Sequence, residues 1–340
     1  MKDLSHLLMQ LYEPNISEEE YSQRYNSYIH LYMLKMEKYN QKWISRVSLS
    51  GKKRLHDLIV FLFRANAFFK GFTHEVISDK HSTINRPVIY AVTHIGKFDI
   101  EILGTVIKDH VTVLTSDFER LGGTLDGLFI SLNGVLFFNH SDKGDRKKVS
   151  ERMVATLRAG DNLMYFPEGA WNMSPNLPML PCFWGIVDVA KQGNADIVPV
   201  AIEQYGKHFK INIGSNINFE SYGSSVEDKT ECISLLRDSL ATLKWEIWET
   251  EPIHRADVES DYWQQYQKSR FSEWPFICRD CIKTFGTGDN DLEFVRYNQM
   301  YIDSLTFKPK GSFGVDEAFA HLHQISPSLN SAFLFNKRNH

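Results

Sequence analysis

Short apolar runs alternate with longer amphipathic stretches from residue 87 onward, and this alternation constrains the fold more than any other feature of the chain. The apolar runs are PVIYAVT, VTVLTS, GVLFFN, NLMYFPE, ADIVPVAIEQY and FKINIG. The stretches between them include DIEILGTVI, RKKVSERMVATLRAG and CFWGIVDVAKQG. Strands that alternate with helices of about 10–15 residues need crossover connections, which join parallel strands. The pattern therefore predicts an α/β fold with a central, mostly parallel sheet flanked by helices.

The rest of the chain differs in character on either side of this region. Residues 1–72 are rich in Leu, Tyr, Lys and Glu with helical spacing, which predicts an N-terminal helical section. Residues 73–254 form the predicted α/β domain, which the long amphipathic segment 224–251 closes. Residues 255–340 form a C-terminal extension rich in aromatic residues, for which a packing surface is favoured over a ligand cage.

Composition and motif content exclude several classes of function. With 340 residues, 43% of them hydrophobic, the chain can bury a sizeable core. Its net charge of −4 gives no overall reason to bind nucleic acid, so an anionic partner would need a local basic patch. The chain lacks the P-loop, G-x-G-x-x-G and H-E-x-x-H motifs, and it lacks the G-x-S-x-G motif of α/β-hydrolases. Nucleotide-binding, dinucleotide-binding and zinc-protease functions therefore lack their minimal residues.

The cysteines predict reduced thiols in a cytoplasmic protein. Cys182 and Cys232 stand alone, and Cys278 and Cys281 form a C-x-x-C that no second pair completes into a zinc site. We therefore predict neither a disulfide framework nor a metal site. The N-terminus also lacks the features of a signal peptide.

One apolar segment suggests contact with a membrane surface. Residues 57–72 are apolar except at positions such as Arg64 and Asn66, and they are too short to span a bilayer. The basic cluster Lys52, Lys53 and Arg54 stands just before them. Residues 51–72 are typical either of a helix lying in the headgroup region of an anionic membrane or of a core-facing helix with an exposed basic start. The first alternative predicts a peripheral location at the inner face of the membrane.

The motif THIGKFD places His94 and Asp99 five positions apart at the end of a predicted strand. The spacing alone is weak evidence, because chance predicts about one such pair and the chain holds three. His94 and Asp99 differ from the other two pairs in their context. Gly96 permits a tight turn between them, and Asp99 begins the next predicted helix, so both can meet at the ligand-bearing edge of the sheet. The pairs His74/Asp79, taken to precede the sheet, and His140/Asp145 are predicted to be surface pairs.

Two further blocks contribute charged residues near the ends of predicted strands. In YFPEGAW, Glu168 follows a strand and Gly169 allows close approach to the backbone; a functional carboxylate and a capping or salt-bridging one are both compatible with this block. In GVLFFNHSDKGDRKK, a positive rim and a set of solvated surface charges are both possible. The residues concerned are His140, Lys143, Arg146, Lys147 and Lys148.

The four blocks THIGKFD, GVLFFNH, YFPEGAW and ADIVPVAI, in this order, resemble those of the glycerophospholipid acyltransferase family. This family includes the acyltransferases of glycerol-3-phosphate, lysophosphatidate and related acceptors. The resemblance covers about residues 87–205 and makes 73–254 an acyltransferase-like domain, whereas residues 1–72 and 255–340 carry no part of it.

The resemblance implies an enzyme that transfers a fatty acyl chain from acyl-CoA or an acyl carrier protein to a hydroxyl acceptor, without a cofactor or a metal. His94 would be the general base and Asp99 would orient it. Glu168 would orient the acceptor, and backbone N–H groups near Gly169, with a basic side chain, would stabilise the oxyanion.

The chain departs from the family pattern where the family carries phosphate-binding arginines. His140 stands at the end of the second block, with Arg146 the nearest replacement, and the third block continues with Ala170, Trp171 and Asn172 instead of Thr-Arg-Ser. Thr93 also replaces the usual Asn before the His. Because neutral His and Trp do not replace the charged fork of Arg, the acceptor is open between a lysophospholipid, glycerol phosphate and an unphosphorylated hydroxyl compound. A catalytically silent lipid-binding protein and an acyl-thioester hydrolase are the alternatives to acyl transfer.

Overall fold

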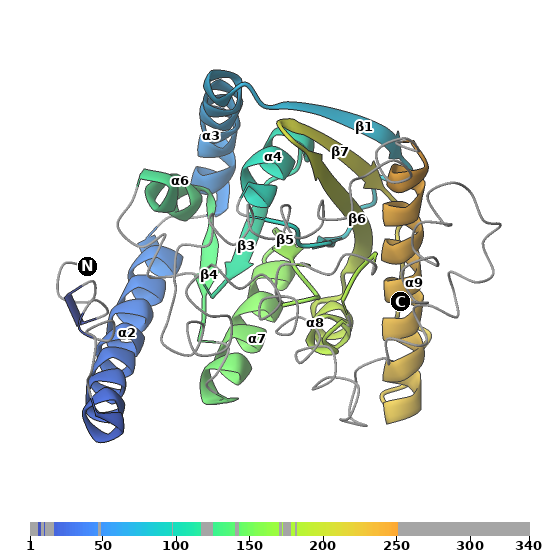
Figure 1. The fold of residues 1–340 in the computed structure, drawn as a ribbon. Coiled ribbons are helices and arrows are strands. Elements are labelled where there is room, and N and C mark those ends of the chain that lie inside the picture. The colour runs from blue at the N-terminus through green and yellow to red at the C-terminus, as the bar shows by residue number, and fades with distance from the viewer. Residues whose placement is uncertain are drawn as a thin grey trace, which may run out of the picture.

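Seven strands form one sheet within the part of the chain that the computed structural model describes (Figure 1). The described residues are 6–7, 10, 17–46, 49–96, 98–116, 125–139, 143–169, 172, 178–180 and 182–250. The strands are β1 (Thr73–Asp79), β2 (Val88–Val92), β3 (Val111–Thr115), β4 (Val135–Phe137), β5 (Asn162–Tyr165), β6 (Asp196–Tyr205) and β7 (His208–Ile213).

The strand order is β1-β7-β6-β2-β5-β3-β4, and every neighbouring pair is parallel except β6 and β7. The predicted α/β class and its mostly parallel sheet are thus confirmed. Because β2 to β6 all run the same way, their carboxyl ends meet at one edge of the sheet. That edge is where an α/β sheet binds its ligands.

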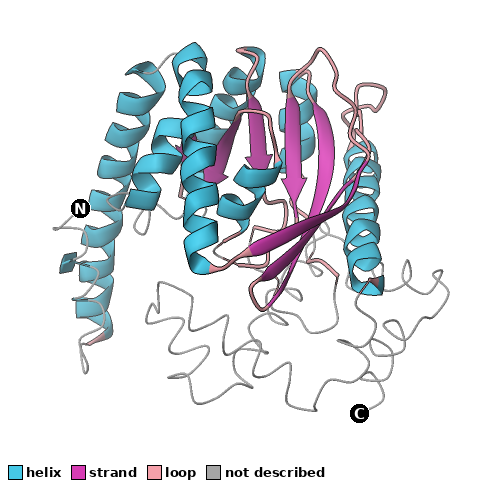
Figure 2. Ribbon diagram, turned by 90° about the horizontal axis from the view of Figure 1, so that it is seen from above, coloured by secondary structure: helices cyan, strands magenta, loops and turns pink. Residues whose placement is uncertain are grey.

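Helices cover both faces of the sheet (Figure 2). Their bounds are α2 (Glu18–Arg46), α3 (Leu49–Lys70), α4 (Asp99–Val106), α6 (Leu125–Asn133), α7 (Lys143–Arg158), α8 (Gly185–Gly193) and α9 (Val226–Glu249). Alternate residues of β2 point to opposite faces, as a strand requires. Ile89 and Ala91 pack in the core beneath α7, α8 and α9, whereas Val88, Tyr90 and Val92 pack against α4 and part of α3. The sheet is therefore buried on both faces, which accounts for the continuous apolar runs in its sequence.

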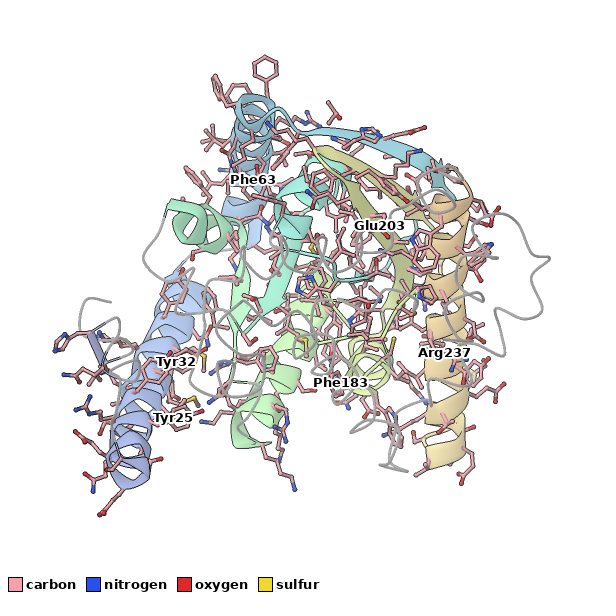
Figure 3. All side chains as sticks on the ribbon, viewed as in Figure 1. Tyr25, Tyr32, Phe63, Phe183, Glu203 and Arg237 are labelled. Carbon is pink, nitrogen blue, oxygen red and sulfur yellow. The ribbon has the colours of Figure 1, made fainter. Side chains whose placement is uncertain are left out.

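Helix α2 protects the edge of the sheet at β4. Its Tyr32 packs with Phe137 of β4 and donates a hydrogen bond to the Ser116 carbonyl at 3.0 Å, whereas Tyr25, about two turns earlier in the helix, is exposed (Figure 3). The Asn40 amide donates to the Phe137 carbonyl at 2.7 Å and accepts from the Phe137 N–H at 3.2 Å. Asn40 thus supplies both hydrogen bonds that a further strand would make to an edge strand, which keeps this edge from pairing elsewhere.

Helix α3 holds helix α4 through a polar contact. Glu101 of α4 accepts hydrogen bonds from Asn66 at 2.8 Å and from Lys70 at 3.0 Å. The Lys70 ammonium also lies 4.8 Å from the centre of the Phe98 ring, and Phe98 directly precedes Asp99, the first residue of α4. The C-terminal end of α3 therefore contacts the N-terminal end of α4.

Two predictions about the outer parts of the sheet were wrong. His74 and Asp79 do not precede the sheet, because both lie in β1, which pairs with β7. Asp79 forms its ion pair with His81. Asp145, predicted to be a surface residue, is buried at the start of α7 and accepts the Asn139 N–H at 2.7 Å.

Several predictions lie beyond the described residues or stay untested. The aromatic extension and the Cys278–Cys281 pair lie outside the described residues. The division of the chain into sections 1–72, 73–254 and 255–340 stays a prediction. Among the described helices, none combines the length and the apolar character needed to cross a bilayer.

We expect Asn40→Leu to lower the free energy of unfolding by roughly 2–4 kcal/mol, because it removes a buried acceptor and a buried donor and leaves the Phe137 N–H and carbonyl without these partners. Urea unfolding followed by circular dichroism measures this change. Gln23→Ala, at an exposed position of the same helix, should change the value by less than about 0.5 kcal/mol. Equal stabilities of the Asn40→Leu and Gln23→Ala proteins would contradict the role of Asn40 at this edge.

Candidate active site

His94 is the second residue after the end of β2, and Thr93 fixes the point at which the strand ends. The Thr93 N–H donates to the Val200 carbonyl of β6 at 3.0 Å. The Thr93 hydroxyl accepts the Ile202 N–H at 3.1 Å. Thr93 therefore replaces the usual Asn with a side chain that ties the strand exit to β6, and His94 is the first residue beyond this attachment.

The structure brings His94 and Asp99 into hydrogen-bond contact, with 2.8 Å between Nδ1 and Oδ2. The same Asp99 oxygen accepts the N–H groups of Ile95 at 2.8 Å and Gly96 at 3.1 Å, so the turn between the two residues fixes the carboxylate. Asp99 also stands at the N-terminus of α4, where the helix dipole favours a negative charge. Because a carboxylate accepts and does not donate, the imidazole proton lies on Nδ1 and Nε2 is the basic nitrogen.

Exposure differs between the two members of this pair. The Asp99 side chain is 1% exposed and the His94 side chain is 20% exposed. A buried carboxylate behind a partly exposed imidazole is the arrangement in which the carboxylate orients and the imidazole reacts. The ring of Phe166 stacks on the imidazole, with 4.2 Å between ring centres and 27° between planes. Phe166 was not among the predicted site residues, although it lies at the end of β5, the strand that pairs with β2.

Glu168 lies beneath the same strand end and is completely buried. Its Oε1 accepts the His94 N–H at 2.8 Å, and its Oε2 accepts the Leu180 N–H at 2.6 Å. Burial raises the pKa of this carboxyl to about 7, against the lowering effect of the two N–H donors and of Lys244. Contact between Glu168 and an acceptor stays a prediction, and in this structure no part of the side chain is exposed.

Gly169 follows in a tight turn and has a positive φ of 68°, a conformation that a side chain would strain. Its N–H donates to the Phe166 carbonyl at 3.1 Å, inside that turn. Cys182 lies farther along the same loop, and its thiol is buried. Burial raises the pKa of the Cys182 thiol well above its usual range, so this cysteine is an inert core residue rather than a nucleophile.

The predicted basic residues occupy the same edge of the sheet but lie apart from His94. Arg146 is exposed in the first turn of α7, which follows β4, and His140 lies outside the described residues. Three strand spacings separate β2 from β4 in the strand order. Since neighbouring strands lie about 4.8 Å apart, the distance between these strand ends is about 14 Å. Lys143, Lys147 and Lys148 are exposed near Arg146, and the Lys148 ammonium lies 4.0 Å from the Glu37 carboxylate of α2. A positive rim at this place stays a prediction.

A buried His–Asp contact elsewhere in the sheet shows that such a contact alone does not make a site. His110 and Asp161 lie 2.6 Å apart, with Nδ1 facing Oδ1, and both are buried. They lie at the amino ends of β3 and β5, away from the ligand-bearing edge, and His110 Nε2 also contacts the Asn133 carbonyl at 2.6 Å. Among the described residues, no group of three or more His, Cys, Asp or Glu side chains could hold a metal ion.

Comparisons with known proteins agree with the blocks that surround this site. The acyltransferase family model matches residues 73–203. The 1-acyl-sn-glycerol-3-phosphate acyltransferase of Saccharomyces cerevisiae is 25% identical over 158 residues, which are 46% of this chain and 52% of that protein. An uncharacterized acyltransferase of Schizosaccharomyces pombe is 26% identical over 137 residues, 40% of this chain and 47% of that protein. The chain thus spans about half the length of the curated relatives it matches.

Among solved structures, the 1-acyl-sn-glycerophosphate acyltransferase PlsC from Thermotoga maritima matches with a TM-score of 0.46 and 13% sequence identity, covering 61% of this chain and 88% of that chain. The sequence matches include the region in which THIGKFD and YFPEGAW place His94, Asp99 and Glu168 around the end of β2. Over residues 73–203, the chain is therefore similar to the acyltransferase family, and both curated relatives carry the name of an acyltransferase.

Proposed function

We propose that the protein transfers a fatty acyl chain from an acyl thioester to an acceptor hydroxyl. The observation that carries this proposal is the contact of 2.8 Å between His94 Nδ1 and Asp99 Oδ2 at the carboxyl end of β2. It gives a partly exposed base whose tautomer is fixed by a buried carboxylate. The yeast relative is named for the same kind of transfer, to an acylglycerol phosphate.

In the proposed mechanism, His94 Nε2 takes the proton of the acceptor hydroxyl as its oxygen attacks the thioester carbonyl. Asp99 stabilises the imidazolium that forms. Collapse of the tetrahedral intermediate breaks the C–S bond, and the departing thiolate takes the proton from His94. The products are an ester and a free thiol, so the donor is acyl-CoA or an acyl carrier protein and no cofactor is consumed. Backbone N–H groups near Gly169 are the proposed oxyanion donors.

For the acceptor we propose a lysophospholipid, a glycerol phosphate or a related unphosphorylated hydroxyl compound. A phosphate would lie toward α7, where Arg146 is exposed at the same sheet edge as His94. At about 14 Å between the two strand ends, the acceptor would have to extend along the edge of the sheet for one end to reach each residue. His140 and Gly169 are the other proposed acceptor contacts.

We further propose a peripheral contact with the inner face of the membrane through residues 51–72. One face of α3 packs on the protein through buried residues such as Ile59 and Ala67. On the helix surface, Phe68 is 78% exposed and Phe69 is 84% exposed. Leu58 and Phe61 are exposed as well, and the exposed Lys53 and Arg54 precede them. An amphipathic helix with a basic start fits an anionic lipid surface.

His94→Ala should lower turnover by about 10²- to 10⁴-fold, because it removes the general base. Release of free thiol from an acyl thioester in the presence of acceptor measures turnover, and the melting temperature should stay the same. His81→Ala, which removes another histidine paired with an aspartate, should leave the rate unchanged. Full activity of the His94→Ala protein would refute the mechanism. Thiol release without acceptor would indicate a hydrolase, and vesicle binding without thiol release would indicate a silent lipid-binding protein.

Arg146→Ala should raise KM for phosphorylated acceptors by about tenfold or more, because a charge-assisted hydrogen bond contributes roughly 1.5–3 kcal/mol. The assay compares phosphorylated and unphosphorylated acceptors with the same acyl donor. Arg158→Ala, at the opposite end of α7, is the matched control. If only unphosphorylated acceptors turn over in the unmodified protein, the phosphate proposal fails and acyl transfer stands.

Replacing Phe68 and Phe69 together with Ser should weaken binding to anionic phospholipid vesicles about tenfold or more, since each buried Phe side chain contributes roughly 1.5–3 kcal/mol. Vesicle flotation measures the bound fraction. Tyr25→Ser removes an exposed aromatic residue of α2 and should not change it. Unchanged flotation of the double variant would rule out this surface as the contact.

A further inference from the structure

We propose that Glu168 is a positioning residue whose buried carboxylate holds the backbone of His94 in place, rather than a residue that contacts the acceptor. This inference rests on the proposed function, since it assigns Glu168 to the same reaction. It starts from where the two carboxylate oxygens point. One oxygen accepts the His94 N–H at 2.8 Å and the other accepts the Leu180 N–H at 2.6 Å.

The backbone of His94 needs such a support because it lies beyond the hydrogen bonds of the sheet. The last of these bonds on this side of β2 is the one from the Thr93 N–H to Val200. At the next residue, the N–H goes to Glu168 and the carbonyl accepts the Asn172 N–H at 2.7 Å. Both peptide groups of His94 are thus held by the segment that follows β5.

The second oxygen of Glu168 links the beginning of this segment, at Glu168, to a later part of it, at Leu180. Leu180 lies twelve residues after Glu168, and its N–H is held by the same carboxylate that holds His94. The Phe183 N–H adds a bond of 2.9 Å to the Pro167 carbonyl, next to Glu168. The carboxylate therefore joins the end of β2 to both ends of the loop, and it does so from a position with no exposed surface. A buried side chain beneath the strand suits a support and does not suit a contact with a diffusing substrate.

This support requires the ionised carboxylate. A carboxylate can accept at both oxygens, whereas a protonated carboxyl group and a glutamine amide each present a donor on one side. That donor would face an N–H group, so one of the two hydrogen bonds would be replaced by a repulsive contact. Burial nevertheless raises the pKa of Glu168 to about 7, which disfavours the ionised form.

The same residue should therefore lower stability at the pH at which it supports catalysis. Its pKa in the folded protein is raised above the ordinary value of 4.5, so the folded state binds this proton more tightly than the unfolded state does. The stability that this proton contributes is fully present below pH 4.5 and is lost as the pH rises through about 7. Glu168→Gln, which stays neutral, should remove this decline between pH 5 and 8.

The test compares Glu168→Gln with Glu203→Gln, both of which neutralise a buried glutamate while keeping its shape. Glu203 lies on β6 (Figure 3), where its carboxylate pairs with Lys244 and accepts a hydrogen bond from Trp248, both of α9. We expect Glu168→Gln to lower kcat about 10- to 100-fold with KM for donor and acceptor within twofold, because small misplacements of a catalytic group have effects of this size. Glu203→Gln should keep kcat even where it lowers the melting temperature.

A raised KM for the acceptor with kcat retained in the Glu168→Gln protein would overturn the proposal, because that result indicates a substrate contact. Glu168→Asp is the second variant: it keeps the charge but is one methylene too short to reach both N–H groups, and it should reproduce the loss of kcat. If Glu168→Gln does not fold, this variant decides by the same two kinetic values.

A measurement that does not depend on turnover separates this inference from the proposed function. Nitrogen-15 NMR of histidine-labelled protein reports the proton on His94 Nδ1. Its signal should shift in Glu168→Gln and stay unchanged in Glu203→Gln. An unshifted His94 signal in both variants would overturn the positioning role. If the unmodified protein shows no acyl transfer with any acceptor, the proposed function fails, and the NMR comparison still decides whether Glu168 positions His94.

Discussion

The parallel pairing of β2 with both β5 and β6 determines which side chains of this protein can meet. β2 is the central strand of the sheet and is buried along its whole length. Because β5 and β6 run in the same direction as β2, three separate parts of the sequence lie together at the carboxyl end of β2. β2 supplies His94, the segment after β5 supplies Phe166 and Glu168, and β6 anchors Thr93. The contacts of the site therefore depend on the parallel direction of these strands, and a residue moved to another strand would lose its contacts with the rest.

The sheet and the pair at its edge were largely predictable from sequence. β2 to β6 carry apolar runs that mark buried strands, and a helix follows each of β2, β3, β4 and β5, so that the next parallel strand ends at the same edge. Given that return, the position of His94 at the end of a strand and of Asp99 at the start of a helix follows from local geometry.

Other features were not predictable, because they depend on long-range pairing. β1 is an edge strand whose side chains are mostly exposed, so it has no apolar pattern to distinguish it from a loop. Its partner β7 lies more than a hundred residues away in the chain. The sequence marks Glu168 as a charge after a strand, but the turn at Gly169 and the neighbouring β2 decide that the carboxylate turns inward. His110 and Asp161 are 51 positions apart in the sequence, so no local motif predicts their contact.

The burial of the Cys182 thiol determines how fast this cysteine reacts with alkylating reagents. It lies two residues beyond Leu180, whose N–H binds Glu168, and it is buried in the same core cluster as Cys232 of α9. Alkylating reagents attack thiolates, so neither cysteine can react until its surroundings open. If only the surroundings of Cys182 open, Cys182 is labelled before Cys232. If the core opens as one unit, both cysteines are labelled at the same rate. The ratio of the two labelling rates therefore distinguishes local opening around Cys182 from opening of the whole core.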